Sequence, residues 1–179
     1  NGLPTITAML LSPVCTGGSV ALSSSPAGGS VPYATFLWSG PNGYNAMVED
    51  PAALPVIPAV AGAYTVTVTD QAGCTATAGL SVVVHPVPVI SAMNSGPVCQ
   101  GANLSLSSTA SAGSGIFSLF QWTGPDNYVA SIEDPAAFST TASSAGVYQV
   151  KVTDSEGCTA TATTTVMINT KPTITAGSN

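Results

Sequence analysis

Four cysteines are the residues of this sequence whose spacing points most directly to chemistry. The interval from Cys15 to Cys74 recurs unchanged between Cys99 and Cys158. An even number of cysteines at a repeated spacing is typical of the disulfides of secreted proteins. A structural zinc site is disfavoured, because the chain has one histidine and no Cys-x-x-Cys pair. We therefore expect all four cysteines to form structural disulfides.

Carboxylates are the second group of residues that could carry chemistry. Glu49 and Asp50 are adjacent, as are Glu133 and Asp134. Adjacent side chains on an extended chain point in different directions, so neither pair forms a convincing acid and base. The one histidine, His85, is not repeated elsewhere in the chain. We expect no catalytic site, no cofactor and no enzymatic activity.

Calcium is the alternative use of these acids. Together with Asp70 and Asp154 they could supply the carboxylate oxygens that calcium prefers. However, Asp before Pro, as at Asp50, commonly forms a turn, and Asp70 in Thr-Asp-Gln-Ala-Gly suits a hairpin loop. We expect turns at these positions rather than a metal site.

Two further features could indicate a binding surface. Tyr44 and Tyr128 both follow a Gly-Pro dipeptide by a few residues and could stack on sugar rings, or equally anchor a loop. Alternating threonines at 159–165 could form a flat binding face, but threonine is also a common solvent-facing strand residue. Surface glycans are thus possible partners.

The charge balance excludes one class of partner. Two basic residues stand against eight acidic ones, giving a net charge of −6, and the isoelectric point is about 4.1. This rules out nucleic-acid binding. Only 6% of residues are charged, against roughly 25% in ordinary globular domains. We expect the neutral, hydroxyl-rich surface to be covered by neighbouring subunits or glycans. The alternative is an extracellular module that tolerates a surface with few charges.

No apolar run predicts a membrane span. Pro, Gly or Ser interrupts every hydrophobic stretch before it reaches the ~18 residues that a span requires. The sequence also shows no signal peptide, so we expect an export signal to have been removed or to lie elsewhere. A secreted protein, at the cell surface or in an extracellular filament, is the predicted location.

The chain repeats itself at a constant offset, which places Cys15 onto Cys99 and Cys74 onto Cys158 without insertions or deletions. The segment Glu-Asp-Pro-Ala-Ala occurs at 49–53 and 133–137, and Gly-Cys-Thr-Ala-Thr-Ala at 73–78 and 157–162. We predict one domain at 4–87, a second at 88–171, and the start of a third at 172–179, where Pro-Thr-Ile-Thr-Ala recurs. The Pro-rich junction at 85–88 predicts a short, stiff linker.

Each repeat has the pattern of an all-β sandwich of about seven strands. Apolar residues recur at every second position, and turn signals follow every ~8 to 12 residues. The expected strands of the first repeat are 5–9, 19–23, 33–38, 44–48, 64–69 and 74–84, with a weaker, proline-containing edge strand at 54–60.

One motif narrows the fold further. Ala-Gly-Ala-Tyr-Thr-Val at 61–66, matched at 145–150, resembles the tyrosine corner of immunoglobulin-like folds, in which the Tyr hydroxyl bonds to upstream backbone. Tyr64 and Tyr148 are the corresponding tyrosines, and Trp38 and Trp122 read as the core tryptophans of the third strand. Valine stands where an antibody domain has its core cysteine, so the usual disulfide between the sheets is absent.

The motifs together resemble a known group of repeat domains. Val-Cys-Thr-Gly (14–17), Phe-Leu-Trp-Ser-Gly-Pro (36–41), Ala-Gly-Ala-Tyr-Thr-Val (61–66) and Thr-Asp-Gln-Ala-Gly-Cys (69–74) are similar to the PKD-like and immunoglobulin-like repeats of giant cell-surface proteins in Bacteroidota, including gliding-motility adhesins. The resemblance implies type IX secretion and a role in adhesion, motility or fibre formation.

We therefore expect a structural repeat module of an extracellular filament or cell-surface adhesin, whose partners are neighbouring repeats of the same array. The alternatives are a module that binds glycans or surfaces, and a spacer domain of a secreted enzyme.

Two disulfide pairings are open. Cys15 with Cys74 and Cys99 with Cys158 would each close a loop of about 60 residues within one domain, worth on the order of 4 kcal/mol. In an immunoglobulin sandwich, however, the turn carrying Cys15 and the hairpin carrying Cys74 lie at opposite poles. With domains stacked head to tail, Cys15 could instead reach Cys158 of the next domain.

Overall fold

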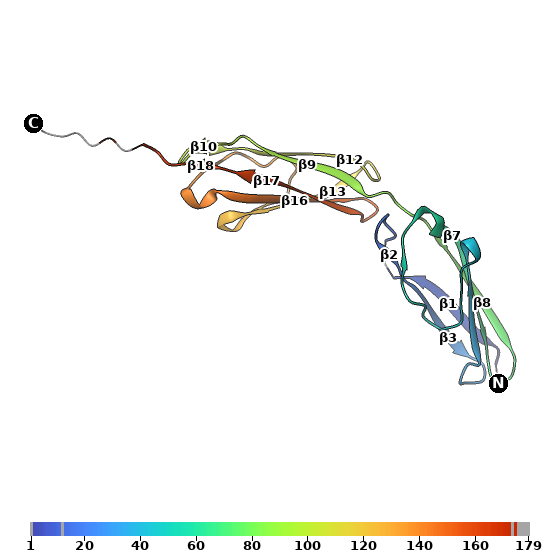
Figure 1. The fold of residues 1–179 in the computed structure, drawn as a ribbon. Helices are drawn as coiled ribbons and strands as arrows, with labels where there is room; N and C mark the ends of the chain where they lie inside the picture. The colour runs from blue at the N-terminus through green and yellow to red at the C-terminus, as the bar shows by residue number, and fades with distance from the viewer. Residues whose placement is uncertain (1, 12, 173, 175–179) are drawn as a thin grey trace, which may run out of the picture. The chain divides into compact units, whose positions relative to one another are not determined.

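The computed structural model describes residues 2–11, 13–172 and 174, and strands dominate it (Figure 1). The chain divides into two compact units, Asn1–Pro86 and Val87–Asn179. The all-β class predicted from the alternating pattern is confirmed. Most of the predicted third repeat, 172–179, lies outside the described residues.

The first unit is built from two groups of antiparallel strands. One group pairs β1 (Pro4–Leu10) with β3 (Leu22–Gly28), and β2 (Ser19–Val20) with β6 (Leu54–Pro55). The other is a four-stranded sheet in the order β5-β4-β7-β8. Its strands are β5 (Asn45–Ala46), β4 (Thr35–Ser39), β7 (Gly62–Thr69) and β8 (Thr75–Val82).

Alternation along β7 shows why this sequence forms a half-buried strand. Tyr64, Val66 and Val68 are almost fully buried, while the intervening threonines face outward. Side chains of a strand alternate between its two faces, so a period of two places every apolar side chain on the core side. Thr67 of β7 pairs across the outer face with Thr77 of β8 through their hydroxyls, 3.1 Å apart.

The core of the first unit lies between the two groups of strands. Val20 and Leu22 from one side meet Trp38, Tyr64 and Val66 from the other. Each fully buried side chain of this kind contributes roughly 1.5 to 3 kcal/mol of transfer free energy. A single apolar core therefore holds this unit together.

The second unit repeats the arrangement with small differences. β12 (Leu106–Ala112) pairs with β9 (Pro88–Asn94), and β11 (Asn103–Leu104) pairs with β15 (Phe138–Ser139). The four-stranded sheet has the order β14-β13-β16-β17. Its strands are β14 (Tyr128–Ala130), β13 (Phe117–Gly124), β16 (Gly146–Asp154) and β17 (Thr159–Val166).

A further pair of strands in the second unit runs parallel. β10 (Val98–Cys99) lies beside β18 (Ile168–Asn169). A parallel pair of this kind needs a long connection, which here is the rest of the sandwich. The pairing places Cys99 on a backbone that is held by a second segment.

The weak strand predicted at 54–60 is shorter than expected. Only Leu54 and Pro55 form strand β6, and a 3-10 turn, η2 (Pro58–Val60), follows. Proline has no N–H to donate to a sheet ladder. However, the equivalent strand β15 is equally short without proline, so the prolines do not by themselves explain the short pairing. In the second unit the turn η4 (Ala142–Ser144) stands at the same place, although that segment has no proline.

Candidate functional site

The cysteines fall into two positions of the repeat. Cys15 and Cys99, at equivalent places near the first strand, are called the strand-end cysteines; Cys74 and Cys158, each just before the last long strand, are called the hairpin cysteines. Cys15 and Cys158 are each in a disulfide. Cys74 and Cys99 carry free thiols. One cysteine of each position is therefore bonded and one is free in this chain. The expectation that all four form structural disulfides stays a prediction for Cys74 and Cys99.

The strand-end cysteine of the first unit is held by backbone pairing. Cys15 forms an isolated parallel bridge with His85. The N–H of Thr16 donates to the carbonyl of His85 at 2.9 Å, and the N–H of His85 donates to the carbonyl of Val14 at 2.8 Å. The chain after β8 thus returns beside Cys15 and fixes its backbone.

The strand-end cysteine of the second unit has the same setting. Cys99 pairs with Asn169 in the parallel β10–β18 pair, and the N–H of Gln100 donates to the carbonyl of Asn169 at 2.9 Å. The hydroxyl of Thr140 donates to the carbonyl of Cys99 at 3.2 Å. The backbone is fixed while the Cys99 side chain remains exposed.

The hairpin cysteine of the first unit is positioned by a buried carboxylate. One oxygen of Asp70 accepts hydrogen bonds from the N–H groups of Ala72 and Cys74, at 2.9 and 2.8 Å. The other accepts from the N–H of Ser30 at 2.9 Å, which ties the hairpin to the β3–β4 loop. Hydrogen bonds from backbone N–H groups hold the pKa of Asp70 below its ordinary value, and the bond from Ser30 has the largest effect.

The second unit repeats this arrangement around Asp154. Its carboxylate accepts from the N–H groups of Ser114, Glu156 and Cys158, at 3.0, 3.1 and 2.8 Å. Cys158 is fully buried, whereas its free counterpart Cys74 is half-buried. In each unit, therefore, an aspartate of the hairpin loop fixes the backbone N–H of the hairpin cysteine.

Of the two disulfide pairings that the sequence left open, the one within a unit is wrong. Cys74 immediately precedes β8, while Cys15 pairs with His85 beyond the other end of β8. A strand of eight residues spans about 26 Å at ~3.3 Å per residue. A disulfide requires alpha carbons within ~7 Å. The free thiols of Cys74 and Cys99 agree with this separation.

The four aromatic residues predicted for the core are buried there. Trp38 and Trp122 are at most 1% exposed, and each indole N–H donates at 3.1 Å to a backbone carbonyl, that of Glu49 or Glu133. The hydroxyl of Tyr64 donates to the carbonyl of Val60 at 2.9 Å. The equivalent bond from Tyr148 to Ser144 measures 3.0 Å. These polar atoms are therefore satisfied inside the core.

The aspartates of the two acid pairs accept hydrogen bonds from nearby serines. Asp50 accepts hydrogen bonds from the N–H of Ser24 and the hydroxyl of Ser23, at 3.0 and 2.9 Å. Asp134 accepts from the N–H of Ser108 at 3.0 Å. Within the described part of the chain, no three His, Cys, Asp or Glu residues are grouped so that they could hold a metal ion. The expectation that these positions hold no calcium site stays a prediction.

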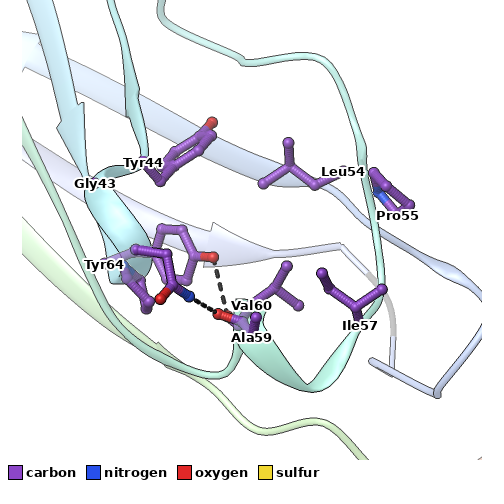
Figure 2. A pocket seen from close by; sticks show the side chains of 10 residues that line it. Gly43, Tyr44, Leu54, Pro55, Ile57, Ala59, Val60 and Tyr64 are labelled. Atoms are coloured by element: carbon purple, nitrogen blue, oxygen red, sulfur yellow. Dashed lines mark hydrogen bonds between the residues drawn. The ribbon is translucent and has the colours of Figure 1, made fainter.

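A shallow hollow of about 310 Å³ opens on the first unit between η1 (Pro41–Gly43) and η2. Figure 2 shows Tyr44 on one side of it and Leu54, Pro55 and Ile57 on the other. Asn42 donates a side-chain hydrogen bond to the carbonyl of Ala59, which joins the two turns. The lining is mostly apolar and contains no group with evident reactivity.

The equivalent place in the second unit is filled differently. Phe138 stands where the first unit has Leu54, and its ring stacks on Tyr128 with centroids 4.7 Å apart. Tyr44 and Tyr128 each lie edge-on against the corner tyrosine, with centroids 5.4 Å apart. Both tyrosines therefore pack against the corner tyrosine of their own unit.

Solved structures of immunoglobulin-like proteins are similar to this chain. The N-terminal eight immunoglobulin domains of Down syndrome cell adhesion molecule align over 94% of this chain and 24% of that chain, with 20% identity and a TM-score of 0.51. The fibronectin(III)-like modules of Clostridium thermocellum CbhA align over 90% and 94%, with 13% identity and a TM-score of 0.49. An amphioxus IgVJ-C2 molecule aligns over 86% and 99%, with 15% identity and a TM-score of 0.40.

The likeness to the adhesion molecule shows that the fold is immunoglobulin-like, as the tyrosine corner predicts. No family model and no curated protein matches the sequence. Among the described residues, no helix is long and apolar enough to cross a membrane.

Proposed function

We propose that the chain is a structural module of an extracellular filament or cell-surface adhesin, in which a disulfide between Cys15 and Cys158 couples successive repeats. Of the four cysteines in the chain, only these two are in disulfides, and each is fixed on hydrogen-bonded backbone. This observation carries the proposal, because a cross-link between repeats resists extension of the chain. Disulfides persist in oxidising compartments, which supports an extracellular location.

The strength of such a cross-link can be stated. The bond would enclose most of the chain, from Cys15 in the first unit to Cys158 in the second. In the chain-entropy model, closing a loop of well over ~100 residues disfavours the unfolded state by about 5 kcal/mol. That is comparable to the whole stability of a small domain. The disulfide would thus contribute much of the stability of a two-repeat segment.

The neutral outer faces support a packed setting for the module. The outward side chains of β7 and β8 are largely threonine and serine, and only 6% of the chain is charged. A surface with so few charges is poorly protected against association. Neighbouring repeats of the same protein are the partners that we propose, and a catalytic role forms no part of the proposal.

The source and the export route are inferred from sequence motifs. The resemblance of 14–17, 36–41, 61–66 and 69–74 to repeats of Bacteroidota surface proteins supports a bacterial adhesin or gliding-motility role and export by the type IX route. The cell adhesion molecule that shares the fold is consistent with an adhesive function.

Immunogold labelling of native cells tests the proposal. An antibody raised against this chain is expected to decorate the cell surface or extracellular fibres on intact, unpermeabilised cells. Labelling that appears only after permeabilisation, inside the cell, would contradict the extracellular role.

A further inference from the structure

The two free thiols occupy the same repeat positions as the two bonded cysteines. Cys99 is the repeat equivalent of Cys15, and Cys74 is the repeat equivalent of Cys158. Both strand-end cysteines pair their backbone in parallel with the segment that follows the last long strand. Both hairpin cysteines receive their backbone position from an aspartate four residues earlier. Each free thiol is therefore presented like a cysteine that is already in a disulfide.

We propose that Cys74 and Cys99 are bonding sites for further copies of the repeat, so that a strand-end cysteine always pairs with a hairpin cysteine of another copy. The proposal rests on the Cys15–Cys158 pairing proposed above. Cys99 would take a hairpin cysteine as its partner, and Cys74 would take a strand-end cysteine. One chain would thus offer one site of each kind for covalent growth in two directions.

The two cysteines of a unit are too far apart to form a disulfide with each other. Cys74 and the His85 segment that holds Cys15 lie beyond opposite ends of β8, about 26 Å apart at ~3.3 Å per residue. In the second unit, Cys158 precedes β17 and Cys99 pairs with Asn169 of β18, beyond its far end. The partner of each free thiol must therefore come from another copy.

The bond formation needs an oxidant, for which a small-molecule disulfide such as oxidised glutathione is sufficient. The Cys99 thiolate attacks one sulfur of that disulfide and releases one reduced thiol. The Cys74 thiolate of a second copy then attacks the mixed disulfide, forms the Cys74–Cys99 bond and releases the second reduced thiol. Two protein thiols are oxidised, and one small disulfide is reduced to two thiols, which take up the two protons that the protein thiols lose.

The test uses two single variants of this chain and their mixture. Cys74→Ser keeps only the strand-end thiol, Cys99, and Cys99→Ser keeps only the hairpin thiol, Cys74. Each variant is incubated at high protein concentration in a glutathione redox buffer, alone and mixed in equal amounts, and examined on a non-reducing gel. The double variant, Cys74→Ser with Cys99→Ser, is the control and keeps Cys15 and Cys158.

The expected result is a disulfide-linked dimer in the mixture, with neither variant dimerising alone to a comparable extent. Cleavage after Met93 separates Cys74 from Cys99, so the linked fragments identify the bond by mass spectrometry. Equal dimerisation of one variant alone would show unselective thiol oxidation and overturn the proposal. Absence of dimers in the mixture would overturn it as well. Neither result depends on where the protein is located in the cell, so failure here is distinct from failure of the extracellular role.

Discussion

At the scale of single residues, the corner tyrosines show how one hydroxyl fixes a loop. The hydroxyl of Tyr148 donates to the carbonyl of Ser144, four residues earlier, and the bond is buried. Loss of one partner leaves the other buried and unsatisfied. The motif at 145–150 could be recognised in the sequence because the spacing of Gly and Tyr reflects this local bond.

Tyr148→Phe is expected to lower the free energy of unfolding by about 1 to 2 kcal/mol, because the carbonyl of Ser144 loses its donor inside the protein. Chemical denaturation measures the change. Tyr44→Phe is the matched control, since its hydroxyl has no hydrogen bond among the described residues. Equal losses in the two variants would contradict the assigned role of the Tyr148 hydroxyl.

The carboxylate of Asp70 is the second residue with a defined role. Its folded pKa is lowered by backbone N–H donors, so its stabilising contribution is complete above the ordinary carboxyl pKa of 3.8 and is lost as the pH falls toward the folded value. The prediction follows that Asp70→Asn is less stable than the parent at neutral pH, and that the difference shrinks as the solution is acidified below that ordinary value.

Denaturation midpoints of both proteins, measured across acidic to neutral pH, check this prediction. Glu49→Gln serves as the control, because it removes one negative charge from an exposed side chain. A difference between Asp70→Asn and the parent that stayed constant down to strongly acidic pH would show that the charge on Asp70 does not stabilise the hairpin.

At the scale of elements, the alternating strands β7 and β8 could be predicted closely. The predicted strand at 19–23 covers only the start of β3, and the one at 54–60 contains only the two-residue strand β6. Alternation identifies β7 and β8 because each is eight residues long and buries one face. The two-residue strands β6 and β10 carry no period, since their pairing depends on distant segments. The parallel pairing of β10 with β18 is therefore visible only in the fold.

The disulfides show the same limit of sequence reasoning. The interval between Cys15 and Cys74, repeated between Cys99 and Cys158, is compatible with a bond within a repeat or between repeats. What decides between them is that β8 runs the length of the sandwich and places the two cysteines at opposite ends. The spacing of cysteines along the chain does not show at which end of the sandwich each cysteine lies.

The turn after β4 depends on a close approach to the corner tyrosine. A Cβ at Gly40 would lie 2.5 Å from the Tyr64 ring. We expect Gly40→Ala to destabilise the first unit by about 1 to 3 kcal/mol, as overpacking in a core does. Gly2→Ala is the control, because a Cβ there meets nothing within 4 Å. Equal denaturation midpoints for the two variants would contradict this packing.

At the scale of the whole molecule, the proposed disulfide should limit how far the chain extends under force. A bond between Cys15 and Cys158 would keep the intervening residues from unravelling, whichever unit unfolds. Extended residues span at most ~3.6 Å each, so reduction should lengthen the fully extended chain by about 500 Å. Pulling single molecules by their ends, with and without a reductant, measures the difference. Equal lengths in both conditions would exclude a cross-link over this interval.

The most direct test of the account is to map the disulfides of the protein isolated from its native source without reduction. Free thiols are first blocked, and the chain is then cut at aromatic residues, which separates Cys15 from Cys74 and Cys99 from Cys158. We expect a linked pair of peptides containing Cys15 and Cys158. Linked peptides that join Cys15 to Cys74, or Cys99 to Cys158 of the same repeat, would contradict it.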